Sequence, residues 1–394
     1  MPAPSGGSLD PGATPLRDRI PAPDLARGGM LLLIALANVV FWAHGRPLGL
    51  RGYPPDPRGV DQVVTIAQLA LVDGRAYPLF ALLFGYGVVQ LARRRAAVGV
   101  PAPAVVRLVR RRGWWLLLIG VAHGVLLFPG DVVGAYGLVA VLLAGALVHA
   151  AGDRALLVVV GCGATVVTVV GAAVALAPGP GTTAVLPSTA LADPLAALGA
   201  RAVDYLGGGL IGSVLGVFGA VALGTWTARR GLLDDPAAHR PLLVRLAVGG
   251  LGAAVLGGLP LALIAGGVWA APFAVTAAAG ALHALTGYAG GLGYAALFGL
   301  LALGRAGRDP GVVARAVRAC GQRSLSCYLA QSVVFAALLP AWTLGLGAVL
   351  GPGAAALVAI GVWLVILVAA AASDRLGARG PAETLLRRLT YGSR

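Results

Sequence analysis

Apolar runs of about 20 residues recur along nearly the whole chain, and this feature restricts the fold more than any other. A helix of about that length crosses the hydrocarbon core of a bilayer. The runs are too long and too continuous for barrel strands, so the sequence predicts an all-α, polytopic transmembrane bundle of about ten helices. The ten segments cover approximately residues 29–44, 77–91, 114–128, 132–150, 155–177, 207–227, 246–268, 285–303, 325–346 and 353–372.

The composition supports a surface that faces lipid. Of 394 residues, 58% are hydrophobic and 11% are charged, whereas a soluble domain carries about 25% charged residues. We therefore expect one transmembrane domain, 28–374. A flexible Pro- and Gly-rich tail, 1–27, precedes it, and a basic tail with a short amphipathic helix, 375–394, follows it.

The net charge of +15 comes from arginine, since the chain contains no lysine. The arginines gather in every second loop, which favours a lipid bilayer with anionic headgroups as partner over nucleic acid. By the positive-inside rule, ten spans place both termini in the cytoplasm. Two segments, 60–71 and 270–285, could instead lie at the outer surface or re-enter the membrane, which would change the count by one or two.

Small residues recur every four positions along one predicted helix, at Gly208, Gly212, Gly216, Ala220 and Gly224. Such a stripe lets another helix approach closely. It predicts tight packing or a hinge within the bundle, or contact between copies in a homo-oligomer.

A polar group in hydrocarbon costs several kcal/mol unless it is paired, so the few polar residues inside the apolar runs are the first candidates for function. His123 and Tyr136 lie at similar distances from the turn Pro129-Gly-Asp131, and Asp131 would cap the following helix. Together they could form a base with an orienting partner, for acid–base catalysis or proton coupling. The alternative is a structural histidine bonded across the hairpin.

Asp24 and Arg27 share one helical face at the cytoplasmic start of the first run. They either cap and anchor the helix, or Arg27 holds a phosphate or carboxylate of a cytoplasmic donor or solute. Asn38 lies deeper on the same helix and makes an interhelical hydrogen bond or lines a cavity.

Two further groups are candidates for substrate binding. Asp73 and Arg75 could gate or floor an external cavity, or belong to a surface turn. Ser324, Tyr328 and Gln331 share one helical face that must look into the bundle, where they line a cavity or bond neighbouring helices. The spacing of the cysteines predicts no metal site, and no phosphate-binding loop or dinucleotide fingerprint is present.

The order of five motifs resembles that of the YeiB-type family of bacterial membrane proteins, also called domain of unknown function 418. The resemblance runs from the first helix to the C-terminus and implies a location in the bacterial inner (plasma) membrane. The motifs are Asp24-Leu-Ala-Arg27-Gly28 leading to Asn38, Leu79 to Gly85, Gly120-Val-Ala-His123 with Pro129-Gly-Asp131 and Tyr136-Gly137, Gly321 to Ser332, and Gly380 to Gly392.

For this family transport has been suggested, and a distant kinship with membrane acyltransferases has been proposed. The first motif resembles the opening of those acyltransferases, but Asn38 stands where they have a histidine. Because an asparagine amide cannot act as a general base near neutral pH, acyl transfer would require His123 to take over. A second departure is Ser326-Cys327, where the family usually has Thr-Asn.

We therefore expect a cavity bounded by the helices at 29–44, 114–128, 132–150 and 325–346. His123, Asp131 and Tyr136 would lie near its outer mouth, and Asp24 and Arg27 near its cytoplasmic mouth. Three functions remain open: acyl transfer from a cytoplasmic donor such as acyl coenzyme A to an envelope acceptor, transport or export of a small anionic or amphiphilic solute, and an accessory role without chemistry. The sequence does not identify the small molecule or lipid that would bind.

Overall fold

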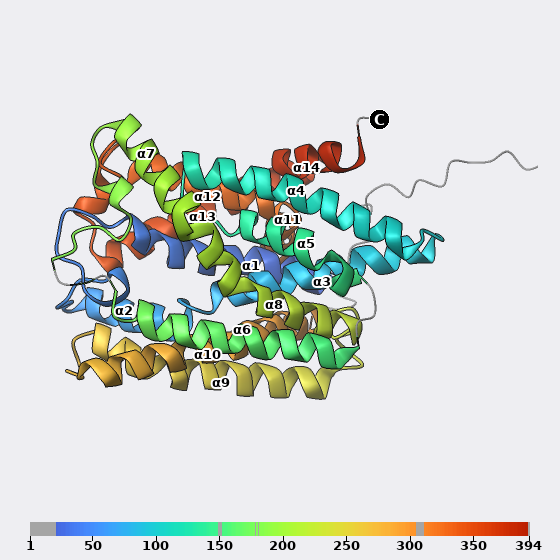
Figure 1. Ribbon diagram of the computed structural model, residues 1–394, viewed down its shortest axis with the longest axis horizontal. Coiled ribbons are helices and arrows are strands. Elements are labelled where there is room, and N and C mark those ends of the chain that lie inside the picture. Colours follow the sequence, from blue (N-terminus) through green and yellow to red (C-terminus); the bar gives the residue numbers. More distant parts are fainter. Residues whose placement is uncertain (1–20, 149–151, 178, 180, 305–310, 393–394) are drawn as a thin grey trace, which may run out of the picture.

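The computed structural model describes residues 21–148, 152–177, 179, 181–304 and 311–392, and this part of the chain is built from helices (Figure 1). Its one β-type pairing is an isolated bridge between His44 and Ala184. The α-helices are α1 (Pro21–Val39), α2 (Val60–Leu71), α3 (Ala76–Ala97), α4 (Ala102–Leu126), α5 (Val133–Val148), α6 (Asp153–Val174), α7 (Pro194–Asp204), α8 (Leu210–Arg229), α9 (Arg240–Ala265), α10 (Phe273–Leu303), α11 (Val312–Gln322), α12 (Ser324–Leu338), α13 (Pro352–Arg375) and α14 (Pro381–Tyr391).

Shorter turns connect some of these helices. They are η2 (Val40–Trp42), η3 (Leu50–Gly52), η4 (Pro187–Thr189), the π-turn η5 (Tyr205–Gly209) and η6 (Leu346–Ala348). Proline occupies the first turn of α7, α9, α13 and α14, where its missing N–H costs nothing. Glycines with positive φ follow α3 and α8, at Gly99 and Gly231, because only glycine takes that conformation without strain.

Each of the ten predicted apolar segments coincides with a helix, which confirms an all-α membrane-type fold. Within the described residues, seven stretches are long and apolar enough to cross a bilayer. The three predicted spans outside this set are α4, whose first half carries several arginines, and the shorter apolar helices α5 and α12. The count of ten spans and the orientation of the termini stay predictions. The seven stretches are Pro21–Trp42, Val60–Ala97, Asp153–Val174, Pro194–Arg229, Arg240–Ala265, Phe273–Leu303 and Pro352–Arg375.

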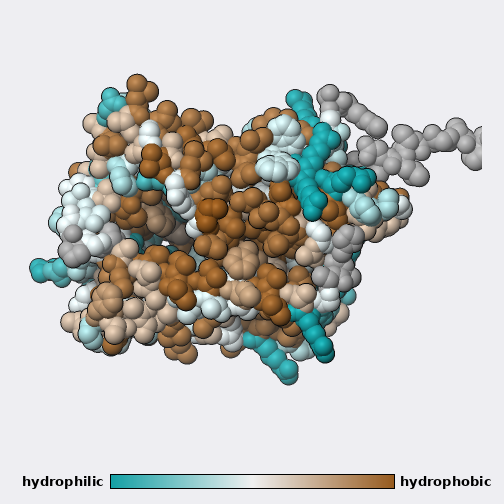
Figure 2. Space-filling view, viewed as in Figure 1, coloured by the Kyte–Doolittle hydropathy of each residue, from teal (hydrophilic) through white to brown (hydrophobic). Residues whose placement is uncertain are grey.

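Most helices run along the long axis of the molecule, which therefore has two distinct ends (Figure 1). One end carries α7, and we call it the α7 end. The opposite end carries α14 together with the connection between α3 and α4, and we call it the α14 end. An apolar surface lies between the two, and strongly hydrophilic side chains gather towards the α14 end (Figure 2). Arginine placement predicts that the α14 end is cytoplasmic.

The two segments left open by the sequence differ in structure. Residues 60–71 form the separate helix α2, which packs against α9 and α13 and buries Thr65 and Gln68. Residues 273–285 are the first part of the continuous 31-residue helix α10 and do not re-enter.

The small-residue stripe of α8 is used along half of its length. A Cβ on Gly224 would lie 1.9 Å from the Leu82 carbonyl oxygen, so this glycine lets α8 touch α3. The C-terminal half of the stripe therefore packs α8 onto α3. At Gly208 and Gly212, in the N-terminal half, none of the described residues comes within the 4 Å at which it would contact a Cβ.

Candidate functional site

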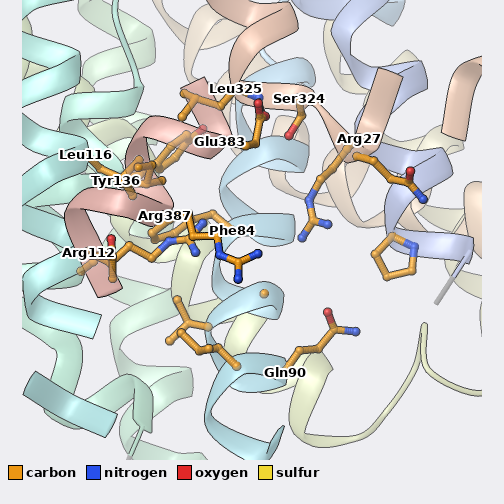
Figure 3. Close-up of a pocket in the computed structure, with 18 of the residues that line it drawn as sticks. Arg27, Phe84, Gln90, Arg112, Leu116, Tyr136, Ser324, Leu325, Glu383 and Arg387 are labelled. Atoms are coloured by element: carbon orange, nitrogen blue, oxygen red, sulfur yellow. Dashed lines mark hydrogen bonds between the residues drawn. The ribbon is translucent and has the colours of Figure 1, made fainter. Parts of the chain in front are cut away.

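A cavity of about 620 Å³ opens at the α14 end, between helices that are far apart in the sequence (Figure 3). Its volume falls within the range of small-molecule sites, about 300–1,000 Å³. All four helices expected to bound it contribute to the lining: α4 and α5 supply side chains over several turns, α1 supplies residues of its first two turns, and α12 supplies its first residues. The helices α3 and α14 complete the wall, and neither was predicted to do so.

Arginines dominate the polar part of the lining. Among the described residues, seven arginines and two carboxylates line the cavity, and together they carry a formal net charge of +5. Such a concave cationic surface raises the local concentration of anions. The charged residues are Asp24, Arg27, Arg94, Arg95, Arg112, Arg323, Arg379, Glu383 and Arg387.

The inner end of the cavity is apolar and aromatic. Leu116 and Val133 lie there beside the rings of Phe80, Phe84 and Tyr136. The Tyr136 ring centroid is 5.1 Å from that of Phe84 and 5.2 Å from that of Phe80. The cavity is therefore amphipathic, with a cationic entrance and an aromatic floor.

His123 and Asp131 are in direct contact below this floor. The His123 Nδ1 and Asp131 Oδ1 atoms are 2.8 Å apart, and both side chains are buried. Asp131 Oδ2 accepts hydrogen bonds from the backbone N–H of Gly134, which caps α5, and from the hydroxyl of Tyr205. A carboxylate that accepts the Nδ1 proton leaves Nε2 as the proton acceptor of a neutral imidazole. This Nε2 is buried and has no hydrogen-bond partner within the part of the chain that the structure describes.

Two rings, Tyr328 and then Phe80, lie between His123 and the cavity. The His123 ring centroid is 5.1 Å from that of Tyr328, and the Tyr328 centroid is 6.4 Å from that of Phe80, which lines the floor. His123 and Asp131 themselves do not line the cavity, whereas Tyr136 does. The expected outer mouth at these residues is therefore replaced by a closed aromatic floor.

The predicted residues of the first helix fall in two places, with Asp24 and Arg27 at the cavity and Asn38 away from it. Asp24 and Arg27 both line the entrance, where their side chains form an ion pair of 3.4 Å. Arg27 also donates a hydrogen bond to the Leu83 carbonyl of α3. Asn38 is half-buried at the far end of α1 and does not line the cavity.

The predicted face of α12 divides in the same way. Ser324 lies at the cavity entrance, and Tyr328 lies beneath the floor. Gln331 is buried and donates a hydrogen bond to the Leu31 carbonyl of α1. Gln331 thus bonds a neighbouring helix, which was one of the two alternatives for this face.

Asp73 and Arg75 are placed away from the cavity. Arg75 is fully buried and bonds the backbone carbonyls of Asp73 and Ala254, so it does not belong to a surface turn. Asp73 forms a bidentate ion pair with Arg51. Burial alone would lower the pKa of Arg51, but the adjacent Asp73 carboxylate holds this pKa above its ordinary value. This pair closes a loop at the α7 end of the molecule.

Several residues of the site were not predicted. Arg112 and Arg387 were assigned to topology because they lie in basic loops and tails. Tyr205 was missed because nothing in its local sequence links it to Asp131. Glu383 belongs to a motif that was noticed, and its carboxylate accepts hydrogen bonds from the Leu325 and Ser326 amides at the start of α12. That motif could have identified Glu383 from the sequence, because it places an acidic residue on a short amphipathic helix.

Comparison with known proteins supports the resemblance drawn from the motifs. Residues 227–393 match the family model described as Protein of unknown function (DUF418). The matched region contains α11, α12 and α14 of the cavity wall, and His123 and Asp131 lie outside it. No curated protein matches the chain.

Proposed function

Since residues 227–393 belong to the family described as Protein of unknown function (DUF418), whose description assigns no reaction, we propose a function from the geometry of the site. The protein transfers an acyl group from an anionic thioester donor, such as acyl coenzyme A, to a hydroxyl acceptor of the cell envelope. The donor enters at the α14 end, which the arginine distribution predicts to be cytoplasmic.

One observation carries this proposal. The amphipathic cavity ends at Phe80, and one further ring, Tyr328, separates it from a buried histidine whose Nδ1 contacts a carboxylate and whose Nε2 has no hydrogen-bond partner among the described residues. A histidine with a purely structural role would bond through both ring nitrogens, because an unsatisfied buried polar atom costs about 1–3 kcal/mol. A histidine oriented by a carboxylate is the usual arrangement of a general base.

The reaction uses His123 as base and then as acid. His123 Nε2 takes the proton of the acceptor hydroxyl while the oxygen of that hydroxyl attacks the thioester carbonyl carbon. The carbon–sulfur bond then breaks, and the leaving thiolate takes the proton from the imidazolium. Asp131 stabilises the transient cation through Nδ1. The Phe80 and Tyr328 rings must move apart for the thioester to reach Nε2.

Purified protein in liposomes tests this reaction. With acetyl coenzyme A inside and an envelope lipid extract present, we expect release of free thiol together with labelled acyl product. His123→Ala should lower this rate by at least about 100-fold, the usual contribution of a general base. The control is His239→Ala, which changes a half-exposed histidine that contacts the Asp235 carbonyl in the turn before α9. Equal rates in the two variants would refute the role of His123.

Transport of an amphiphilic anion is the second candidate. The observation that favours it is the closed aromatic floor, because a cavity open at one end and sealed at the other is one state of an alternating-access cycle. In this case proteoliposomes would release a loaded anionic amphiphile without consuming any thioester. Thioester consumption that depends on His123 would exclude simple transport.

A further inference from the structure

We propose that the cavity recognises a diphosphate group and that Arg27, Arg112 and Arg387 are its ligands. This inference deepens the function proposed above, and it rests on that function in taking the same cavity as the ligand site. It adds the chemical class of the group that the arginines bind. A diphosphate is the feature shared by soluble coenzymes and by lipid diphosphates.

The three arginines reach one space from three separate helices. Figure 3 shows Arg27 of α1, Arg112 of α4 and Arg387 of α14 around the same opening. Guanidinium groups bind phosphate oxygens in a bidentate manner and keep their charge at any physiological pH. Three guanidinium groups in different directions match an anion with several oxygens better than they match a single carboxylate.

The charge of the lining points to the same class of ligand. Its formal charge of +5 over the described lining residues attracts anions, and one carboxylate would offset only a small part of it. Of the two acidic side chains, Glu383 accepts hydrogen bonds from the amides of Leu325 and Ser326 and from the Ser326 hydroxyl. Its charge therefore stabilises the N-terminus of α12. A ligand with two linked phosphates supplies several negative charges at once.

The aromatic floor restricts the rest of the ligand. Phe84 and Tyr136 lie inward of the arginines in the same cavity, so a molecule that fills it has an apolar or flat part beyond its diphosphate. Both a pantetheine thioester attached to a nucleotide and a prenyl chain have this form. The arginines bind the diphosphate that both ligands share. The aromatic floor then discriminates between the pantetheine thioester and the prenyl chain.

Matched arginine pairs make the test specific. Arg112 and Arg387 line the cavity, whereas their neighbours Arg111 and Arg388 are exposed and do not. We would measure binding of inorganic pyrophosphate to the purified full-length protein by calorimetry, with orthophosphate and acetate at equal ionic strength for comparison. Melting temperature and gel filtration of each variant would show that it is folded.

We expect pyrophosphate to bind more tightly than orthophosphate or acetate. Arg112→Gln and Arg387→Gln should each weaken pyrophosphate binding about tenfold or more, as expected for loss of a charge-assisted hydrogen bond. Arg111→Gln and Arg388→Gln should leave it within about twofold, because exposed charges are screened. Absence of pyrophosphate binding, or equal losses in both members of a pair, would overturn the inference.

Two further ligands identify the source of the diphosphate. Coenzyme A represents a soluble donor and farnesyl diphosphate a lipid-borne one, and the tail that fits the floor binds more tightly than pyrophosphate alone. If pyrophosphate binds through these arginines and no thioester is consumed, the diphosphate site stands and the acyl-transfer proposal fails. If thioester is consumed through His123 but pyrophosphate does not bind, the acyl-transfer proposal stands and the diphosphate site fails.

Discussion

Single glycines set how closely the helices around the cavity approach. Gly321 lies in the last turn of α11, and a Cβ at this position would lie 1.8 Å from the Asp24 carbonyl oxygen of α1. Gly28 meets α11 in the same manner, with the Val317 carbonyl oxygen 1.9 Å from the position of a Cβ. Backbone atoms cannot yield as a flexible side chain can, so α1 and α11 must move apart if either glycine changes.

We therefore expect Gly321→Ala to lower the free energy of unfolding by about 1–3 kcal/mol, the usual cost of overpacking. Thermal melting of the purified protein in detergent measures this change. The control is Gly145→Ala on α5, where a Cβ meets no atom within 4 Å and alanine favours the helix. Gly145→Ala should be neutral or slightly stabilising. Similar melting temperatures for both variants would contradict the packing argument.

The contact between His123 and Asp131 follows from spacing, since the two residues are eight positions apart and a tight turn joins their helices. Such local geometry can be predicted from sequence. Tyr205 reaches the same carboxylate from 74 positions away, through α7 and the π-turn. No periodicity predicts a contact over that distance, because it depends on how separate helices pack. Asn38 does not line the cavity, because only the first two turns of α1 reach it and Asn38 lies at the other end of that helix.

Among the helices, hydropathy predicted most spans but could not predict the position of α14. Its apolar face packs against α4 and α12, so it becomes part of a binding cavity in place of a solvated tail. The α10 segment was harder to interpret because its first half, 273–285, contains His283 and Thr276 among small residues. Both side chains are buried against neighbouring helices, and burial of this kind is not visible in a hydropathy profile.

Helix α14 should detach when its anchor is weakened. Glu383→Gln removes the negative charge that accepts the Leu325 and Ser326 amide hydrogens, so we expect faster hydrogen exchange across residues 381–391. Mass spectrometry of peptides from this helix measures the rate. Asp193→Asn, which alters the cap of the exposed helix α7, serves as control and should leave that rate unchanged. Unchanged exchange in Glu383→Gln would show that apolar contacts alone hold α14.

For the whole molecule, the arginine distribution predicts that the α14 end faces the cytoplasm. We would replace the native cysteines with serine and introduce Ala102→Cys at the α14 end or Ala192→Cys at the α7 end, both exposed. An impermeant maleimide should label Ala192→Cys in intact spheroplasts and Ala102→Cys only after permeabilisation. The reverse labelling pattern would show that the orientation is the opposite one and that the cavity entrance faces outside.

Helix α14 is synthesised after the apolar helices, and it is also one wall of the cavity. A chain halted by a premature stop before residue 381 would insert most of its apolar helices, yet it would expose an open trough without Arg387 or Glu383. In the proposed cavity, ligand capture therefore begins only once α14 has been synthesised and has folded back. A nascent or truncated copy in the membrane would not bind ligand and so would not compete for it with molecules that contain α14.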